Sequence, residues 1–543
     1  MSGLLNKLAS DLSPNNLRYL FYMVTPNETT FESVEDIPDI LKPATTWMLL
    51  LVLLEYLVLD EKKYSFNDAV TSINAGVLSL TMKIGGRFLS ASCYPYIYEK
   101  IHIIDLPKDS PYTWLLCFFT QDLVYYLGHR ATHEAGVFWA FHQMHHSSEY
   151  YNLSTALRQG AVQDIAMLFF DMLQATIIPP NVFVVHRYLN LIYQFWLHSN
   201  AVPYLGPLEY FINTPSSHRV HHGRNPYCID RNYGGTLIIW DRLFGTYEAE
   251  RNGEEIAYGL VTPVATFNQL WCQFFEFKAI GYDKGQMKDE KGEEIFPGLW
   301  NKAGERIFQR IAKMKKRIRA ALWPPGYFPG VETSPFFIWL CLKDNTEGIP
   351  EVEQPVVKFN PPLTNALRYY LLAQWFMLIS YVLQFDEQRI QMSWPEFFFQ
   401  MGFLTCFIQM FGYYFDHSRF SLVFDVSRLG VSVLAALLLN NAGLLAYGLS
   451  SLAVVSWLHS SGNIPERRRI SRKKRARFQT SSRNLSSSEH PCQHLLTSFN
   501  GLMVGANFEP GGRHNIVQAL DLFQLHDFSE QINNFTKHLE KNA

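Results

Sequence analysis

His129-Arg-Ala-Thr-His133 opens a series of three histidine boxes, which continues with His142-Gln-Met-His145-His146 and ends with His218-Arg-Val-His221-His222. Residues three or four apart share one face of a helix, so each box directs two or three imidazoles to one side. Neutral imidazole nitrogens are common ligands of transition metals. The three boxes therefore predict a metal centre that is assembled from helices.

Composition points to a membrane protein. The chain has 543 residues, a formal net charge of −2 and a pI near 6.8, so bulk charge indicates neither nucleic acid nor an anionic surface as partner. Its seven cysteines are scattered and include no Cys-x-x-Cys, which argues against a disulfide framework and a thiolate metal site. Apolar residues are instead concentrated in long runs that are typical of membrane spans.

Three segments precede the first box. Residues 44–60 form the first expected span and contain Glu55, which either faces protein or water or reaches the membrane surface. Residues 66–100 are amphipathic and fit either a short span or an interfacial helix. Residues 112–127 form a second clear span, which continues directly into the first box.

Asp122, Tyr126, His129 and His133 follow one another at intervals of four, three and four residues, which places them on one helical stripe. From this position the Asp122 carboxylate can accept the free N–H of an imidazole and orient a metal ligand. A structural ion pair or a solvated carboxylate is the alternative. The stripe leads from the membrane into the expected site.

Two apolar runs, at 161–178 and 181–198, follow the second box and are separated by two prolines. Each run has about eighteen residues, or about 27 Å as a helix, which is close to the thickness of a hydrocarbon core. We therefore expect a transmembrane hairpin that returns the third box to the side of the first two. Asp164 and Asp171 in the first arm are either a functional pair or partners of a polar group on a neighbouring helix.

Two histidines of the hairpin lie outside the boxes. His198 ends the second arm, and it either joins the metal ligands or lies at the membrane interface. His186 belongs to the opposite end of the same arm. Because that end should lie across the membrane from the boxes, we exclude His186 as a ligand.

The C-terminal half indicates which side of the membrane the boxes face. Residues 250–330 are polar, with a basic run at 313–319, and are expected to form a connector and an interfacial helix. Four further spans fit, at about 364–385, 391–413, 424–439 and 442–459. An even number of spans returns the chain to its starting side, and eight basic residues between 467 and 477 mark that side as the cytosol.

These patterns predict an all-α fold, namely a polytopic membrane helical bundle with a histidine-rich, di-metal cap at its cytosolic face. Five regions are expected along the chain. They are a cytosolic N-terminal segment (1–43), a transmembrane catalytic domain (44–250), a cytosolic connector (251–363), a four-span membrane region (364–460) and a basic, serine-rich cytosolic tail (461–543).

The number of imidazoles suggests two ions. Eight are too many for one tetrahedral zinc site but suit two ions with four or five ligands each. Ligand type alone does not select among iron, copper, zinc and nickel. With His198 as the ninth member, the expected ligands are His129, His133, His142, His145, His146, His198, His218, His221 and His222. No Gly-x-Gly-x-x-Gly follows a strand pattern, so electrons must come from a separate reductant.

The box order, the intervening hairpin and the closing segment Asn232-Tyr-Gly-Gly…Trp240-Asp-Arg-Leu-Phe-Gly-Thr246 resemble the integral-membrane fatty acid hydroxylase and sterol desaturase superfamily. The resemblance covers about residues 44–250. The closing segment combines a glycine turn with an aromatic-rich element, and we expect it to pack under the histidines.

Within this superfamily the chain is most similar to the branch that cleaves glyceryl ether lipids. Glu134 directly follows the first box, residues 152–159 fit this branch, and several spans follow the last box. The resemblance implies two iron ions, tetrahydrobiopterin as reductant and alkylglycerols as substrates, at the endoplasmic reticulum membrane. The implied reaction hydroxylates the ether-bearing carbon, and the resulting hemiacetal collapses to a fatty aldehyde and a glycerol derivative.

The resemblance also suggests roles for single residues. Glu134 is expected to act near the pterin or a metal, with a surface carboxylate as the alternative. Asn152 and Arg158 are expected to support the ligands.

Two other functions fit part of the pattern. Another oxygen-dependent hydroxylase or desaturase of the superfamily would act on sterol, sphingolipid or acyl chains with electrons from a haem carrier. A metal-ion transporter would need ligands near the middle of the membrane, where Asp164 and Asp171 are the candidates. The boxes lie at span ends instead, which favours an enzyme.

Overall fold

The computed structural model describes residues 9–60, 62–284, 349–389 and 391–465, together with the isolated positions 6, 287, 292, 321–322 and 325. The described part is helical and contains no β-strand, only two isolated bridges, Ile212–Leu237 and Gly223–Tyr258. The basic runs at 313–319 and 467–477 and the serine-rich tail lie outside the described residues.

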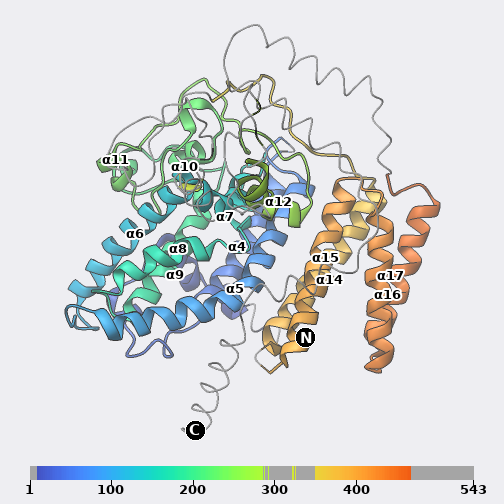
Figure 1. Cartoon of the computed structure of the whole chain (residues 1–543), viewed down its shortest axis with the longest axis horizontal. Helices are drawn as coiled ribbons and strands as arrows, with labels where there is room; N and C mark the ends of the chain where they lie inside the picture. Colours follow the sequence, from blue (N-terminus) through green and yellow to red (C-terminus); the bar gives the residue numbers. More distant parts are fainter. Residues whose placement is uncertain are drawn as a thin grey trace. The chain divides into compact units, whose positions relative to one another are not determined.

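The described elements are helices, as the sequence predicts (Figure 1). The α-helices are α2 (Pro14–Leu17), α3 (Pro26–Thr29), α4 (Leu41–Val58), α5 (Phe66–Ile101), α6 (Pro111–Glu134), α7 (Gly136–His146), α8 (Asp164–Gln174), α9 (Pro180–Leu197), α10 (Pro215–His222), α11 (Ile239–Phe244), α12 (Gln269–Lys278), α14 (Asn365–Gln388), α15 (Trp394–Phe415), α16 (Ser421–Leu438) and α17 (Ala442–Ser460). Short 3-10 turns are η1 (Arg18–Phe21), η2 (Thr155–Leu157), η3 (Gly206–Tyr210) and η4 (Pro226–Cys228), and η5 (Ala279–Asp283) is a π-helix.

Four of these helices are long and apolar enough to cross a membrane: α4, α14, α16 and α17. The chain is therefore a multi-pass membrane protein. The expected spans at 112–127, 181–198 and 391–413 form the helices α6, α9 and α15, but these do not meet the same test of length and composition.

The helices α4, α5, α6, α8 and α9 pack together, and α7 and α10 lie at one end of them (Figure 1). We call this the histidine end of the bundle. Near the start of α5, Asp68 accepts a hydrogen bond from Arg158 at 3.0 Å, close to the second box. Near the other end of α5, the Tyr94 hydroxyl donates to the Ile178 carbonyl at 3.0 Å, in the turn between α8 and α9. The segment expected as a short span or an interfacial helix thus runs the length of the bundle.

The two arms of the hairpin differ in length. α9 has 18 residues, as expected, whereas α8 has only 11, or about 16 Å. The expectation of two equal arms was wrong because turns at 161–163 and 175–177 take up both ends of the first apolar run. Arg187 of α9 donates to Asp171 at 2.8 Å and lies 4.0 Å from Asp164. The alternative of polar packing between neighbouring helices is therefore confirmed.

The N-terminal segment packs at the end of the bundle that is remote from the histidines. Trp114, in the first turn of α6, donates to the Thr29 hydroxyl at 2.8 Å, and Lys108 donates to the Glu32 carbonyl at 3.1 Å. Asn181, in the first turn of α9, donates to the Phe31 carbonyl. Residues 25–40 therefore lie at the beginning of α4.

The other end of α4 reaches the histidine end. Glu55 accepts hydrogen bonds from the Leu153 amide at 2.6 Å and from the Ser199 hydroxyl at 3.0 Å, so it faces protein and does not extend to the membrane surface. α4 is itself long and apolar enough to be a span. The sequence analysis placed both the N-terminal segment and the boxes in the cytosol. If α4 crosses the membrane, the two lie on opposite sides of it, and only one of them is cytosolic.

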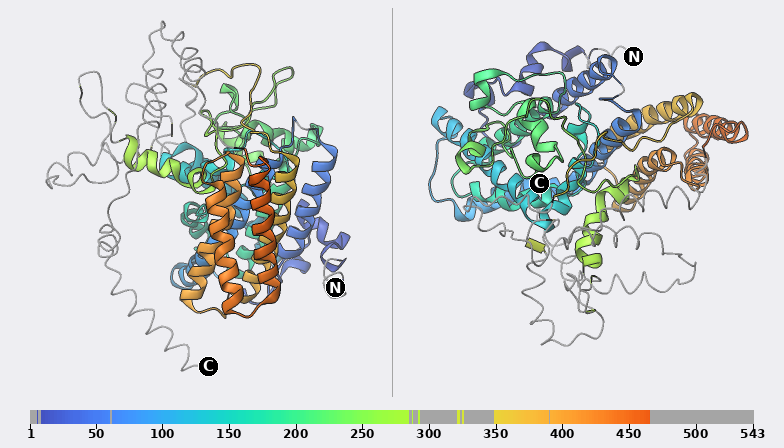
Figure 2. Two further views of the ribbon diagram at one scale, coloured as in Figure 1. Left: turned by 90° about the vertical axis from the view of Figure 1, so that its right-hand side faces the viewer. Right: turned by 90° about the horizontal axis from the view of Figure 1, so that it is seen from above.

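The helices α14 to α17 run alongside one another and pack on α5 through α15 (Figure 2). One hydrophobic core joins Val70 and Leu78 of α5 to residues such as Leu371, Phe407 and Phe411. The Thr364 hydroxyl before α14 donates to the Asn463 carbonyl after α17 at 3.0 Å. The four helices thus begin and end at the same side, as an even number of spans requires.

Candidate metal centre

Local helix breaks bring the first two boxes together. Pro111 at the first position of α6 and the Ser110 side chain, which accepts from the Tyr112 amide, start the helix that carries the first box. Ala135 then adopts an extended conformation, with φ −124° and ψ 120°. Because this single residue separates α6 from α7, the chain folds back and the second box faces the first.

The third box and His198 complete the cluster. α10 carries the third box and packs on α9, whose C-cap is His198. All nine histidines are buried and form two groups in which the candidate ligand nitrogens lie within 4.8 Å of one another. The first group is His129, His133, His142, His146 and His221, and the second is His145, His198, His218 and His222.

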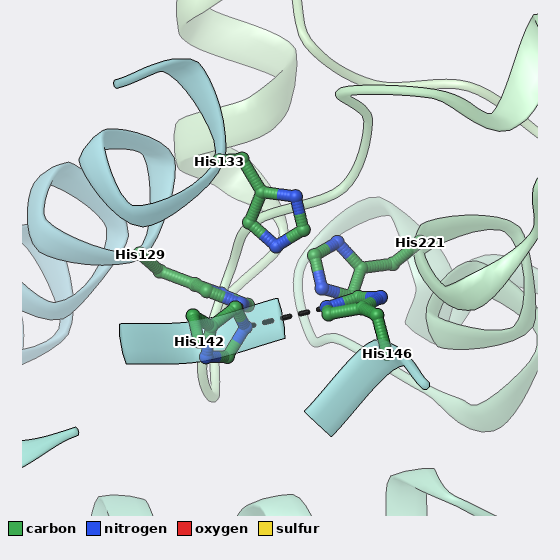
Figure 3. Close-up of side chains that lie close together, drawn as sticks. All are labelled: His129, His133, His142, His146 and His221. Atoms are coloured by element: carbon green, nitrogen blue, oxygen red, sulfur yellow. Dashed lines mark hydrogen bonds between the residues drawn. The ribbon is translucent and has the colours of Figure 1, made fainter. Parts of the chain in front are cut away.

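The group of five draws on all three boxes (Figure 3). The Nε2 atom of His142 lies 3.2 Å from Nε2 of His129 and 3.3 Å from Nε2 of His146. The Nε2 atoms of His133 and His221 are buried and have no hydrogen-bond partner among the described residues. These five rings therefore surround a common centre, and two of them turn unsatisfied lone pairs or N–H groups into the interior.

The group of four is centred on His198. Its Nε2 atom lies 3.1 Å from the Nε2 atoms of His145, His218 and His222. The two groups adjoin, because the rings of His146 and His222 stack with their centroids 4.3 Å apart. The structure therefore brings His198 to the three other histidines of this group, and its role as a metal ligand stays a prediction.

Hydrogen bonds at Nδ1 fix the tautomers of four rings. The Nδ1–H groups of His129, His145, His198 and His221 face the carbonyl oxygens of Tyr233, Arg158, Gln194 and Arg231 at 2.8, 3.1, 2.9 and 2.8 Å, respectively. A neutral imidazole has one N–H, so Nε2 of each of these rings carries a lone pair. The close approach of His145 Nε2 to His198 Nε2 is then a contact between two lone pairs, which a cation between them would make favourable.

The spacing of the nitrogens also fits metal ions. With metal–nitrogen bonds of about 2.1 Å, ligands at right-angle or tetrahedral directions are separated by about 3.0 to 3.4 Å. The observed separations of 3.1 to 3.3 Å fall in this range. The residues present therefore fit two adjacent metal ions, one for each group.

Burial keeps the ligands neutral. In α7, desolvation lowers the pKa of His142, His145 and His146 well below the usual value, and the neighbouring imidazoles lower it further. The same causes lower the pKa of the third-box histidines His218 and His222. These imidazoles are thus uncharged at neutral pH, which is the form that binds a metal.

Asp122 supports the centre indirectly. Its carboxylate accepts hydrogen bonds from Asn190 at 2.6 Å, from the Thr236 and Leu237 amides at 2.7 and 3.0 Å, and from the Trp240 indole at 3.0 Å. The expected bond from an imidazole to Asp122 is wrong, because the N–H of His129 goes to the Tyr233 carbonyl instead. Asp122 holds the segment that follows Tyr233.

The closing segment packs under the histidines, as expected. Asp241 accepts from the Tyr233 and Gly234 amides at 2.8 and 2.7 Å and so fixes the turn that carries the Tyr233 carbonyl. A Cβ atom on Gly234 would lie 2.4 Å from the Leu237 carbonyl oxygen, so only glycine fits there. Sequence reasoning missed Asp241, although its position in the closing segment was the available signal.

Arg158 contacts a histidine of the cluster directly, whereas Asn152 contacts residues around it. The Arg158 carbonyl binds His145, and the Arg158 guanidinium donates to Asp68 at 3.0 Å and to Ser147 at 3.0 Å. Asn152 accepts from the Ser154 amide at 3.1 Å and donates to the Lys63 carbonyl at 3.0 Å. Asn152 thus shapes the turn that leads to Arg158 and makes none of the described hydrogen bonds to a histidine.

Glu134 is buried and lies beside the cluster. Its carboxylate accepts from Arg130 at 2.7 Å and from the Tyr233 hydroxyl at 3.2 Å. The alternative of a surface carboxylate is therefore excluded. Glu134 belongs to neither histidine group.

His186 lies away from the centre, as expected. Its Nδ1 atom is 2.6 Å from the Tyr22 hydroxyl, and its ring packs against Trp114. Trp114 lies in the first turn of α6, at the end of the bundle that is remote from the histidines, and Tyr22 packs against Trp114.

The chain is similar to fatty acid hydroxylases and, over more of its length, to alkylglycerol monooxygenases. Residues 114–246, which contain all three boxes and the closing segment, match the fatty acid hydroxylase family. An alkylglycerol monooxygenase of Caenorhabditis elegans is 43% identical over 427 residues, covering 78% of this chain and 82% of that protein. The alkylglycerol monooxygenase of Homo sapiens is 37% identical over 415 residues, covering 76% of this chain and 85% of the human protein.

The chain accordingly belongs to the alkylglycerol monooxygenase family and is an oxidoreductase. A more distant relative, the ornithine lipid hydroxylase OlsE of Rhizobium tropici, is 25% identical over 207 residues. No solved structure matches this chain significantly.

Proposed function

We propose that this membrane lipid monooxygenase hydroxylates the ether-bearing carbon of alkylglycerols, with two iron ions and with tetrahydrobiopterin as reductant. The observation that carries the proposal is the pair of buried histidine groups, with five and four members, in a chain 43% identical to an alkylglycerol monooxygenase. One oxygen atom of O2 enters the substrate, and the other leaves as water with two electrons from the pterin. The hemiacetal product then splits into a fatty aldehyde and a glycerol derivative.

Each histidine group would hold one ion. Bound iron would supply oxygen activation. The chain's own contribution is to hold nine neutral imidazoles in fixed orientations, in part through the backbone carbonyls of Tyr233, Arg158, Gln194 and Arg231. Burial of the cluster also excludes bulk water, which protects the reaction from side reactions.

Glu134 would act at the edge of the centre. Its hydrogen bonds to Arg130 and Tyr233 hold the carboxylate in place, and Tyr233 links it to the turn that positions His129. We propose that this carboxylate acts near the pterin or near a metal ion, at the edge of the histidine cluster.

The histidine end is assigned to the cytosolic face of the endoplasmic reticulum membrane. Lys62 and Lys63 follow α4 at this end, and eight basic residues between 467 and 477 follow α17. Basic residues close to spans favour the cytosolic side. This orientation places the polar head of an alkylglycerol in water and its reactive carbon at the membrane interface.

The test uses membranes from cells that express the full-length chain. With iron, O2, tetrahydrobiopterin and a 1-alkylglycerol, these membranes should release fatty aldehyde, and His145→Ala should lower the rate at least about 100-fold because it removes a ligand from the smaller group. His459→Ala replaces an exposed histidine of α17 and should leave the rate unchanged. Absence of aldehyde with pterin, together with oxidation of a sterol, sphingolipid or acyl chain by a haem reductant, would reject the assignment.

The transporter hypothesis loses its main support. Asp164 and Asp171 were the candidate membrane ligands, and both lie within 4.0 Å of Arg187. Because the Arg187 guanidinium already lies beside both carboxylates and offsets one of their charges, the pair is a poor cation site.

A further inference from the structure

Asn27-Glu28-Thr29 has the Asn-x-Thr pattern of N-linked glycosylation. Asn27 and Glu28 are exposed, and they lie in the short helix α3 before the first candidate span. We infer that Asn27 carries an N-linked glycan on the lumenal side of the membrane. The inference rests on the proposed orientation of the histidine end.

The position of Asn27 follows from contacts that the residues just after it make. Thr29 binds Trp114 at the beginning of α6, and Phe31 binds Asn181 at the beginning of α9. Trp114 precedes His129 by 15 residues in the same helix, or about 22 Å. Asn27 is therefore at the end of the bundle that is remote from the histidines.

One candidate span separates Asn27 from the histidine end. α4 has 18 residues, or about 27 Å, and runs from Leu41 to the contacts of Glu55 with Leu153 and Ser199. Ser199 directly follows the candidate ligand His198. If the histidines face the cytosol, residues 25–40 face the lumen, where oligosaccharides are transferred to asparagine.

Charge distribution agrees with this assignment. Residues 25–40 contain no lysine or arginine, and the first basic residue after them is Lys42 in the first turn of α4, whereas Lys62 and Lys63 follow α4 as a pair at its other end. Segments without lysine or arginine are favoured on the non-cytosolic side.

Three other Asn-x-Ser/Thr patterns occur in the chain, and the proposed orientation excludes all of them. Asn152 is 1% exposed and lies at the histidine end, where it binds Lys63. Asn484 and Asn534 follow the last candidate span and the basic run, outside the described residues. The four patterns thus distinguish the two possible orientations of the protein.

The modification is a group transfer. A bond forms between the Asn27 side-chain nitrogen and the anomeric carbon of an oligosaccharide, the bond between that carbon and a lipid pyrophosphate donor breaks, and the amide nitrogen loses a proton. The donor and the transferase belong to the lumenal side of the membrane. Because Thr29 is buried against Trp114 in the folded protein, transfer must precede this packing.

The experiment compares the electrophoretic mobility of the full-length chain, expressed in cells with an endoplasmic reticulum, before and after treatment with an N-glycosidase. We expect the enzyme to increase the mobility of the unaltered chain by one glycan. Asn27→Gln should abolish this shift, and Thr29→Ser, which keeps the pattern and the hydroxyl, should retain it. Asn484→Gln and Asn534→Gln are matched controls and should also retain it.

Three results would overturn the inference: no shift in the unaltered chain, a shift that survives Asn27→Gln, or a shift that is lost on replacing Asn484 or Asn534. The last result would also reverse the proposed orientation. Aldehyde release from the same membranes is measured in parallel. Activity without a glycan refutes the inference alone, and a glycan on Asn27 without activity refutes the proposed reaction alone.

Discussion

For single residues, the hydrogen bond at Nδ1 of a histidine determines whether its Nε2 atom presents a lone pair to the centre. Four imidazoles donate through Nδ1 to backbone carbonyls and thereby present Nε2 lone pairs to their neighbours. The carbonyls belong to Tyr233, Arg158, Gln194 and Arg231, and all four lie outside the histidine boxes. Replacing the side chain of one of these residues would keep the hydrogen bond to the imidazole, because the acceptor is a backbone carbonyl. A shift of the backbone at that residue would break the bond.

His198 should behave as a ligand even though it belongs to no box. Its Nε2 atom contacts three other ligand nitrogens at 3.1 Å, so His198→Ala removes the central member of the group of four. We expect the iron content of the purified protein to fall from about two ions to about one per chain, with loss of activity. His186→Gln, in the helix that His198 caps, is the control, and equal iron in both variants would contradict the assignment.

Asp122→Ala should destabilise the protein strongly. The substitution leaves two buried backbone amides, an indole and an Asn190 amide without their acceptor, at about 1–3 kcal/mol for each unpaired group. We expect a free energy of unfolding lower by about 3 kcal/mol or more, measured by thermal denaturation in detergent. Asp105→Ala, at a side chain that is 93% exposed, should cost less than about 1 kcal/mol. Equal effects of the two substitutions would refute the role of Asp122.

How much of the site the sequence predicts depends on sequence separation. Box spacing is local and predicts eight of the histidines that the structure brings together, whereas the position of His198 at a helix end left its role open. The partners of Asp122 are 68 to 118 residues away in the chain, so spacing on one helix suggested the wrong partner. Helical periodicity indicates which face a side chain occupies but does not specify what packs on that face.

For single helices, local turns make α8 shorter than the apolar run that contains it. The run at 161–178 is mostly apolar, but its helix α8 ends at Gln174 and the Gln174 carbonyl accepts from the Ile177 and Ile178 amides. The amphipathic run at 66–100, by contrast, forms a single 36-residue helix. Hydropathy records composition, whereas helix length also depends on turn hydrogen bonds and on neighbours that cover polar positions.

Arg428→Ala should damage the C-terminal helices. Arg428 and Asp425 form a fully buried ion pair of α16 at 2.7 Å, and Tyr370 and Tyr414 also donate to the carboxylate. Removal of one partner leaves a buried charge and should cost about 3–5 kcal/mol of stability. Combining Arg428→Gln with Asp425→Asn should recover more than half of this loss, because neither charge remains.

The matched control for this pair is Arg389→Ala. Arg389 and Asp386 have the same three-residue separation, but the Asp386 side chain is 43% exposed. The substitution should change stability by less than about 1 kcal/mol. Thermal denaturation in detergent compares the variants, and an equal loss at both pairs would show that burial of the first pair is unimportant.

At the scale of the whole molecule, the centre connects segments that are far apart in the chain, so metal should stabilise the entire fold. Chelation should lower the thermal midpoint of the protein, and iron should restore it. The metal-free protein should also become less stable as pH falls below about 6.5. Burial lowers the pKa of the α7 and α10 imidazoles in the folded state, so the unfolded state binds more protons there.

The size of this pH effect can be stated for each histidine. Between the unfolded pKa near 6.5 and the lowered folded pKa, each such imidazole reduces the free energy of unfolding by about 1.4 kcal/mol per pH unit. Thermal midpoints of chelated protein between about pH 7 and about pH 5 measure the effect. A midpoint that is constant over this interval would contradict the burial of neutral histidines.

The core shared by α5 and the C-terminal helices limits how the protein can be shortened. A fragment that ends at residue 250 contains every histidine of the cluster, yet it would expose Val70 and Leu78 of α5 to solvent or lipid. It would also delete Gln269, which donates to the Thr71 carbonyl of α5 at 2.6 Å. Recombinant versions for production or crystallisation should therefore extend at least to residue 465, with trimming confined to the tail beyond it.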